Sequence, residues 1–288
     1  MKRTLLVLLL IFGFCYVATP KYTISACAIF RNEAPYLREW IEYHRLIGIE
    51  HFYLFNNLSE DDYLSILQPY IDAKIVELTD WPYSATNQKE WNKIQCSAYN
   101  TILKKKKFET NWLAIIDTDE FIVPIATKTL HLFLRDYEEC SGIGINWQLY
   151  GTSHIDQIPP HKTLIGTLTK KAPTDYSRNH YIKSIVRPKR VHSISQPHFC
   201  KYKKPFYHVT ADKTRFPKES LTPTISINKI RINHYTTRDG QFFNKEKKRR
   251  YSEWFPTQPP LEEDPALSSI EDDVIVSYVP ELEQKLFH

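Results

Sequence analysis

The chain has 288 residues, of which 42% are hydrophobic and 25% are charged, so it can bury a sizeable core and is not a disordered chain. Its formal net charge is only +5 at pH 7. The basic runs Lys104–Lys107 and Lys245–Arg250 fall in stretches with helical character, where a solvated helix face is the ordinary explanation. We therefore predict no nucleic-acid partner.

The N-terminus begins with Lys2 and Arg3 and continues with an almost uninterrupted apolar segment from Leu5 to Ala18. A charged start followed by an apolar stretch is typical of a signal peptide or a signal-anchor. Residues 1–20 are therefore predicted to export the protein or to attach it to a membrane, and the sequence leaves open whether this segment is cleaved. We expect the folded part to begin near Tyr22 and not to need these residues.

From Tyr22 onward, strand-like and helix-like patterns alternate. Leu37, Trp40 and Ile41 have the three- and four-residue spacing that places them on one face of a first helix. Strands that alternate with helices form a mostly parallel sheet with right-handed crossovers, so we predict an α/β fold. The predicted strands are Tyr22–Phe30, His51–Phe55, Lys74–Leu78 and Trp112–Ile116, and the helix before the last of them carries Trp91, Ile94, Gln95, Ala98 and Ile102 on one face.

The last of these strands is followed by three carboxylates within four residues, Asp117, Asp119 and Glu120. Like charges this close raise one another's pKa, and a divalent cation bound by Asp117 and Asp119 would relieve the repulsion. Open α/β sheets bind ligands at the carboxyl ends of their strands, where this acidic group is predicted to lie. The alternative is that the acidic residues only cap the next segment. A phosphatase motif also begins with Asp-x-Asp, but it has Thr or Val where Phe121 stands and would lie on the first strand, so we set it aside.

Further short motifs accompany this acidic group. They are Arg31-Asn32-Glu33, Asn56-Asn57-Leu58-Ser59-Glu60-Asp61, Gln95 with Asn100, Asn146-Trp147, Tyr150-Gly151-Thr152-Ser153, the segment Tyr181–Pro188, His192, His198 and Ile232-Asn233-His234-Tyr235. In their order and spacing, from about residue 23 to 251, these motifs resemble glycosyltransferase family 92, once called domain of unknown function 23. The chain departs from the family pattern at Thr237-Arg238, where the family usually continues with Lys-Ser.

The resemblance implies a GT-A-like α/β fold in which residues 21–125 form a nucleotide-sugar half and residues 126–251 a mixed α+β acceptor half. It also implies a nucleotide-sugar donor, with UDP-galactose as the donor that the family suggests, and a glycan acceptor. Residues 252–288, which are rich in proline and acidic residues, are predicted to be a peripheral extension. By the same resemblance, the donor-binding residues are Arg31, Asn32, Glu33, Asn57, Gln95, Asp117 and Asp119.

Sugar transfer requires that the charge of the departing diphosphate be stabilised and that the acceptor hydroxyl lose a proton. Mn²⁺ or Mg²⁺ bound by Asp117 and Asp119 would stabilise the diphosphate as a Lewis acid. In an inverting reaction a carboxylate takes the proton, and Glu120 and Asp156 are the candidates. The sequence does not rank these two residues.

His234 ends a strand-like segment about 115 residues after the carboxylates, and we expect the fold to bring it beside them. A neutral imidazole would complete the metal site and suits Mn²⁺ better than Mg²⁺, which prefers oxygen ligands. The alternative is a histidine that only hydrogen-bonds a loop carbonyl.

Trp147, His192 and His198 are predicted, by the resemblance, to line the sugar and acceptor site. Trp147 would stack on a sugar face, but a core tryptophan explains the residue equally well, and the two histidines also suit a surface loop. The predicted function is metal-dependent hexosyl transfer with inversion. A non-catalytic glycan-binding or assembly protein with the same fold is the alternative, although such a protein has no reason to retain metal ligands.

Overall fold

A computed structural model describes residues 19–215 and 219–288. The predicted signal or anchor segment, Leu5–Ala18, lies outside these described residues. Within the described part of the chain, none of the helices has the length and apolar character needed to cross a bilayer.

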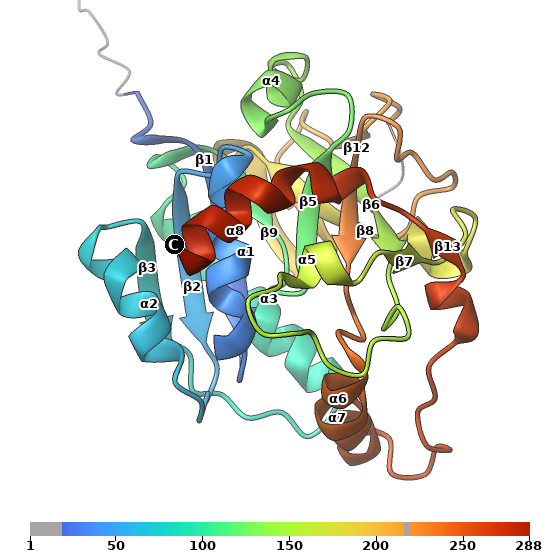
Figure 1. Ribbon diagram of the computed structural model, residues 1–288. Coiled ribbons are helices and arrows are strands. Elements are labelled where there is room, and N and C mark those ends of the chain that lie inside the picture. The colour runs from blue at the N-terminus through green and yellow to red at the C-terminus, as the bar shows by residue number, and fades with distance from the viewer. Residues whose placement is uncertain (1–18, 216–218) are drawn as a thin grey trace, which may run out of the picture.

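The structure is built around a nine-stranded sheet with the strand order β3-β2-β1-β4-β8-β6-β12-β5, and β11 pairs with β6 beside this path (Figure 1). The main elements are β1 Tyr22–Phe30, α1 Ala34–Leu46, β2 His51–Asn56, α2 Tyr63–Asp72, β3 Val76–Asp80, α3 Gln88–Lys105, β4 Thr110–Ile115, β5 Glu120–Pro124, α4 Leu130–Arg135, β6 Gly142–Leu149, α5 Leu164–Thr167, β7 Lys170–Lys171, β8 Ile182–Val186, β9 Val191–Gln196, β10 Phe199–Tyr202, β11 Val209–Thr210, β12 Ile230–His234, α6 Gly240–Phe242, the π-helix η3 Phe243–Lys247, α7 Lys248–Trp254, β13 Ile270–Glu271 and α8 Val279–Phe287. Short 3₁₀-helices are η1 Ser177–His180, η2 Pro188–Arg190, η4 Pro265–Ser268 and η5 Val274–Tyr278.

The predicted α/β fold is confirmed. β3, β2, β1 and β4 are parallel neighbours, whereas β8 runs antiparallel to both β4 and β6, and β12 runs parallel to β6 but antiparallel to β5. The sheet is therefore parallel in its first half and mixed in its second. The third predicted strand is displaced by two residues, because β3 begins at Val76 rather than Lys74.

Side chains of the central strands alternate between two cores on opposite faces of the sheet, as the two-residue period of a strand requires. Ala26 and Ala28 of β1 belong to the larger core, together with α1 and α8, while Cys27 and Ile29 belong to a second core with α3 and β9. Both faces are therefore covered, which explains why the central strands are apolar without polar alternation.

The buried face of α1 also carries His44, which is fully buried. Its Nδ1 lies 2.8 Å from the carbonyl oxygen of Trp40, and its Nε2 accepts a hydrogen bond from the backbone N–H of Ile122 at 3.3 Å. This arrangement fixes a neutral tautomer with the proton on Nδ1. Burial lowers the pKa of His44 to about 3, although the bond to Trp40 opposes the shift.

The C-terminal residues 252–288, predicted to be a peripheral extension, pack onto the domain. Helix α8 lies across α1 (Figure 1), and Leu282 and Leu286 belong to the larger core. Asp272 forms an ion pair of 2.5 Å with Arg231 of β12, and both side chains are almost fully buried. The physical reason is the apolar face of α8, which has to be buried against another element.

Candidate active site

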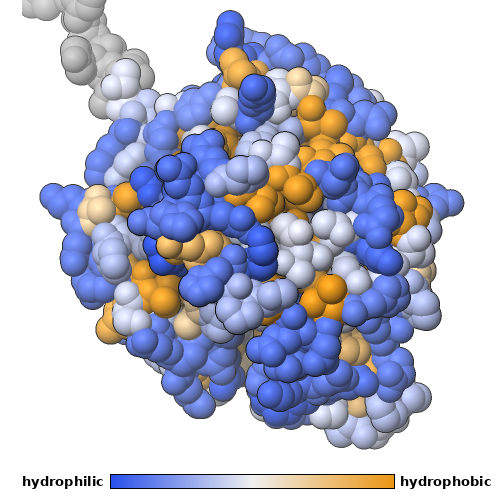
Figure 2. Space-filling model, viewed as in Figure 1, coloured by the Kyte–Doolittle hydropathy of each residue, from blue (hydrophilic) through white to orange (hydrophobic). Residues whose placement is uncertain are grey.

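A cleft with a volume of about 650 Å³ opens at the carboxyl ends of β1, β2 and β4. The segment from α6 to α7 borders the cleft at the lower end of the molecule in Figure 1, and Figure 2 shows hydrophilic residues covering this end. Lining residues include Arg31, Asn32, Glu33, Asn57, Gln95, Asp117, Asp119, Trp147, Arg178, His198, His234 and Lys247. We refer to this cavity as the main cleft. It brings together most of the predicted site residues.

Asp117 lies in the floor of the main cleft, two residues beyond the end of β4. Its Oδ1 accepts hydrogen bonds from Gln95 Nε2 at 2.6 Å and from the hydroxyl of Tyr99 at 3.1 Å. Its Oδ2 accepts a charge-assisted bond from Lys183 Nζ at 2.7 Å. Both carboxylate oxygens therefore already have protein donors. Gln95, predicted to bind the donor, lines the main cleft and holds Asp117.

Glu120 is fully buried beneath Asp117 and is not among the lining residues of the main cleft. Its Oε2 accepts the backbone N–H of Asp117 at 2.9 Å and lies 3.7 Å from Lys183 Nζ. Burial raises the pKa of Glu120, although Lys183 opposes the shift. A carboxyl group enclosed in this way does not reach an acceptor hydroxyl, so the structure gives Glu120 a role in shaping the Asp117 loop rather than the predicted role of base.

Asp119 and His234 meet because β5 and β12 are antiparallel neighbours. His234 is opposite Glu120 in the register, and the backbone N–H of Tyr235 donates to the carbonyl of Asp119 at 2.9 Å. Consequently His234 Nε2 lies 3.4 Å from Asp119 Oδ2. The side chain of Asp119 is 23% exposed, so it faces the main cleft. The fold thus brings His234 beside the acidic group, as expected.

Three neighbouring side chains favour the ionised form of Asp119. Burial on its own would raise the pKa of Asp119, but His234, Arg238 and Lys247 outweigh it, and the pKa lies below its ordinary value. Burial also lowers the pKa of His234, although Asp119 opposes that shift.

Lys247 is the last residue of the π-helix η3, which interrupts the α-helical segment from Gly240 to Trp254. Single π-helical turns of this kind are frequent at functional sites because they redirect one side chain. The Lys247 ammonium donates to Thr236 Oγ1 at 2.9 Å and lines the main cleft. Burial lowers its pKa to about 8, and the neighbouring Arg250 contributes in the same direction.

Arg238 occupies the position at which the chain departs from the family pattern. It is fully buried, ion-paired with Glu33, and has its guanidinium 4.2 Å from the centre of the Tyr36 ring. Burial raises the pKa of Glu33, and Arg238 opposes the shift. Glu33, predicted to bind the donor, therefore fixes the start of α1 against the segment that follows β12.

Three predicted donor residues lie where β1 and β2 end. Arg31 is exposed on the rim of the main cleft. Asn32 has a positive φ of 56°, and its Oδ1 accepts the backbone N–H of Glu60 at 2.8 Å. The Asn57 amide donates to the carbonyl oxygens of Trp81 and Tyr83 at 2.7 and 2.8 Å. Arg31 is thus free to contact a ligand, whereas the two asparagines hold the loops that form the cleft wall.

The predicted sugar and acceptor residues separate into two groups. Trp147 and His198 line the main cleft, and the Trp147 ring lies 4.3 Å from that of His234 between ring centroids. Trp147 Nε1 and His234 Nδ1 are buried and have no hydrogen-bond partner within the described part of the chain. His192 and Asp156, by contrast, are exposed and do not line the main cleft. The structure does not bring those two residues to the site.

Two lysines of this site, Lys183 and Lys247, were not predicted from the sequence. Lys183 interrupts the apolar strand β8, and a charged residue between Ile182 and Ile185 was a readable sign of a buried ion pair. Lys247 lies within a run of basic residues, and nothing in that run distinguishes it from its solvated neighbours.

Comparison with known proteins now decides the family. Residues 21–284 match the model of glycosyltransferase family 92. The chain belongs to glycosyltransferase family 92. This match includes most of the C-terminal residues that pack against α1 and β12, in agreement with their place in the domain.

Two similar proteins of this family come from plants. A family 92 protein of Ricinus communis is 26% identical over 200 residues, which cover 67% of this chain and 34% of the relative. A family 92 protein of Arabidopsis thaliana is 25% identical over 229 residues, covering 75% of this chain and 35% of the relative. The chain thus spans about a third of the length of these relatives.

Solved structures resemble the fold at low identity. Staphylococcus aureus TarS in complex with UDP-GlcNAc has a TM-score of 0.39 and 13% identity, with 71% of this chain and 62% of that chain covered. Glucosyl-3-phosphoglycerate synthase from Mycobacterium tuberculosis, in complex with Mn²⁺, UDP and glucosyl-3-phosphoglycerate, has a TM-score of 0.33 and 11% identity, with 59% and 58% covered.

The predicted metal site of this family 92 protein fits only in part. Asp119 Oδ2 and His234 Nε2 provide one oxygen and one nitrogen donor close together at the main cleft, a set that suits Mn²⁺. Asp117 does not fit direct ligation, because Lys183, Gln95 and Tyr99 already occupy its oxygens. In residues 19–215 and 219–288, no group of three or more His, Cys, Asp or Glu side chains is arranged to hold a metal ion. A cation held here would need further ligands from a bound substrate.

Proposed function

We propose that this protein transfers a hexose from a nucleotide sugar to a hydroxyl group of a glycan, with a divalent cation at Asp119 and His234. The observation that carries the proposal is the pairing of Asp119 Oδ2 with His234 Nε2, 3.4 Å apart, at a cleft formed by the carboxyl ends of parallel strands. Membership of family 92 supports the same reaction class. UDP-galactose is the first donor to test.

The chain's own residues would stabilise the diphosphate in two ways. Asp119 and His234 would hold Mn²⁺ or Mg²⁺, and the phosphate oxygens of the donor would complete its coordination. A cation in that position supplies Lewis-acid stabilisation of the departing diphosphate. Lys247, with a pKa of about 8, is mostly protonated near pH 7 and adds positive charge on the same side of the main cleft.

Lys183 would act on the donor indirectly, through Asp117. Its ammonium holds Asp117 at 2.7 Å and thereby fixes the loop that carries Asp119. Because Lys183 already neutralises Asp117, we propose that Asp117 positions the loop that carries Asp119 and is not a direct metal ligand.

Inversion of the anomeric centre is part of the proposal and requires a base at the acceptor side. Glu120 is enclosed and Asp156 lies outside the main cleft, so we propose that the base is one of the carboxylates that line it from the C-terminal part of the chain. These carboxylates are Glu246, Glu253, Glu262, Glu263 and Asp264. The anomeric configuration of the product, read by NMR, tests inversion directly.

Donor turnover tests the proposed function. Purified protein is incubated with UDP-galactose, UDP-glucose and UDP-GlcNAc in the presence of Mn²⁺, Mg²⁺ or EDTA, and UDP release is measured. We expect release with at least one donor that requires the cation. Asp119→Asn should reduce this cation-dependent UDP release by about 100-fold. Even the loss of a side chain that only supports a metal ligand typically costs about 10–100-fold in activity.

Asp156→Asn is the matched control, because it removes an exposed carboxylate that does not line the main cleft. It should retain the wild-type rate. Equal losses in both variants would contradict the assigned site. Binding of UDP without turnover of any donor would favour the alternative, a glycan-binding or assembly protein.

A further inference from the structure

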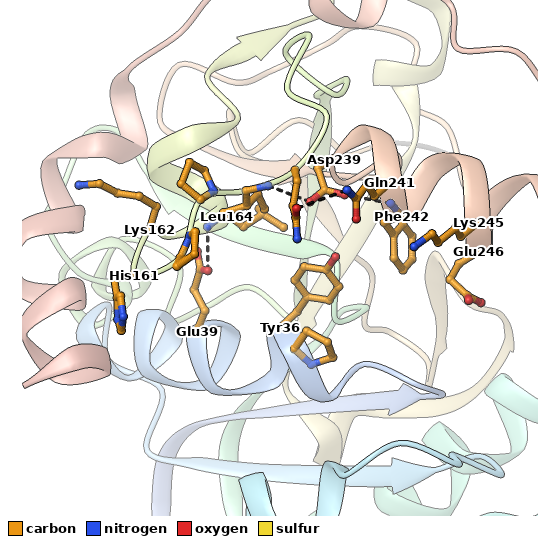
Figure 3. Close-up of a pocket in the computed structure, with 15 residues that line it drawn as sticks. Tyr36, Glu39, His161, Lys162, Leu164, Asp239, Gln241, Phe242, Lys245 and Glu246 are labelled. Atoms are coloured by element: carbon orange, nitrogen blue, oxygen red, sulfur yellow. Dashed lines mark hydrogen bonds between the residues drawn. The ribbon is translucent and has the colours of Figure 1, made fainter.

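A second cavity, with a volume of about 440 Å³, lies beside the main cleft and is shown in Figure 3. We call it the side pocket. Its walls come from the first turns of α1, from residues 157–164 and from residues 239–246. Phe242 and Glu246 line both cavities, so the side pocket and the main cleft share one wall. No residue predicted from the sequence to bind donor, metal or acceptor lines it.

Tyr36 is the central side chain of the side pocket. Figure 3 shows its ring in the middle of the cavity with the hydroxyl directed towards the start of α6. This hydroxyl forms no hydrogen bond with any residue that the structure describes, and the Phe242 ring stands at 87° to the Tyr36 ring with 5.7 Å between centroids. An aromatic surface next to an unused hydroxyl is suited to a ligand with both C–H faces and hydroxyl groups.

Two carboxylates are buried in the walls of the side pocket. Glu39 is 9% exposed and accepts the backbone N–H groups of Leu164 and Ile165 at 2.8 and 3.0 Å. Asp239 is 7% exposed and accepts the backbone N–H groups of Ile158 and Phe242 at 3.0 and 2.9 Å.

Each of these oxygens has one donor and retains a further lone pair. No Lys, Arg or His in the described ranges forms an ion pair with Glu39 or Asp239, although Lys162 and Lys245 also line the side pocket. The free lone pairs of Glu39 and Asp239 favour ligands that donate hydrogen bonds from hydroxyl groups. Gln157 and Gln241, which also line the pocket, add amide groups that both donate and accept.

From this combination we propose that the side pocket binds a pyranose ring of the glycan acceptor, next to the sugar whose hydroxyl is modified in the main cleft. The inference rests on the proposed function, and it adds the place where the acceptor is held. A volume of about 440 Å³ is within the range of about 300–1,000 Å³ found for small-molecule sites. A glycan would pass from one cavity to the other along Phe242 and Glu246.

The shared wall also connects the side pocket to residues of the main cleft. The Arg238 guanidinium lies 4.2 Å from the Tyr36 ring centre and 5.4 Å from that of Phe242. The same guanidinium pairs with Glu33, which lines the main cleft. A sugar seated on Tyr36 therefore touches a side chain that packs directly on this ion pair.

Saturation-transfer NMR tests the side pocket with methyl α- and β-pyranosides of galactose, glucose, mannose, N-acetylglucosamine and fucose as probes. We expect transfer to at least one pyranoside. Tyr36→Ala should weaken that binding by at least tenfold, and Tyr36→Phe, which removes only the hydroxyl and preserves packing, should weaken it several-fold. Thermal unfolding of each variant confirms that it is folded.

Calorimetric titration with UDP and Mn²⁺ is the matched measurement at the main cleft. UDP affinity should be unchanged in Tyr36→Phe and lost in Asp119→Asn, and the Asp119 variant should still bind the pyranoside. Absence of pyranoside binding in a protein that turns over a nucleotide sugar, or binding that is unaffected in Tyr36→Ala, would overturn the side-pocket assignment. If the protein instead binds a pyranoside through Tyr36 but turns over no nucleotide sugar, that result would count against the proposed function.

Discussion

Replacing Lys183 by methionine tests the buried ion network below the main cleft. Methionine approximates the length and the apolar stem of lysine but lacks the ammonium group. The wild-type ammonium lies 2.7 Å from Asp117 Oδ2 and 3.7 Å from Glu120 Oε2, and the Lys183 and Glu120 side chains are fully buried. The variant therefore leaves two neighbouring carboxylates without their cation.

Removing one partner of a buried ion pair typically costs about 3–5 kcal/mol, because the remaining charge stays uncompensated. We expect this range for the free energy of unfolding at pH 8. At about 2 °C per kcal/mol for a domain of this size, the melting temperature should fall by roughly 6–10 °C. Asp117 keeps its bonds from Gln95 and Tyr99, so the loop should remain in place.

The loss of unfolding free energy in Lys183→Met should also depend on pH. Burial already raises the pKa of Glu120, and removing Lys183 takes away the main opposing influence, so the carboxyl group of the variant holds its proton to a higher pH. A folded-state pKa above the unfolded value stabilises the fold at low pH and loses that contribution as the pH rises. The difference between wild type and variant should therefore shrink from pH 8 to pH 5.

Urea unfolding followed by tryptophan fluorescence at pH 5 and pH 8 measures both effects. Lys189→Met is the matched control, because Lys189 is exposed, and a surface change of this kind should alter stability by no more than about 0.5 kcal/mol. If Lys183→Met were as stable as this control at pH 8, or if its cost were the same at both pH values, the ion network would not have the energetic role assigned to it.

Three other changes test the fold. His44 is buried and neutral, and its pKa is about 3 against an ordinary 6.5. Its contribution to stability is therefore fully present above pH 6.5 and declines as the pH falls towards 3. In His44→Leu, the free energy of unfolding should consequently fall less between pH 6 and pH 4 than in the wild type. Leu282→Ala in α8 should cost about 2–5 kcal/mol by urea unfolding, since Leu282 is fully buried. Removing residues 1–20 should give soluble, folded protein by size-exclusion chromatography and circular dichroism, because β1 begins at Tyr22, and aggregation would contradict the proposed targeting role.

The first half of the fold could be predicted from the sequence. The apolar strands β1, β2 and β4 and the buried face of α1 follow from hydrophobic periodicity, which reports burial directly. The same periodicity placed Asp117 and Asp119 at the carboxyl edge of the sheet, since an apolar strand that ends in acidic residues leaves no other position for them. The motif order indicated family 92, and the family match agrees.

Which side chains face the main cleft at that edge depends on contacts between distant segments. Asp117, the first aspartate of the acidic motif, turned out to be held by Lys183, which is 66 residues away along the chain and reaches it because β8 pairs with β4. Glu120 proved to point into the sheet, because the chain reverses after Asp119 and the next strand begins.

Long-range pairing likewise determines where the histidines and the C-terminal residues lie. His234 reaches Asp119 through the antiparallel register of β12 with β5, while His192, in a motif of similar appearance, stays on the surface. Periodicity within a segment reports which face is buried, but it has no information about which distant segment covers that face. Strand register and the packing of α8 on α1 supply that information, and both depend on contacts between residues far apart in the sequence.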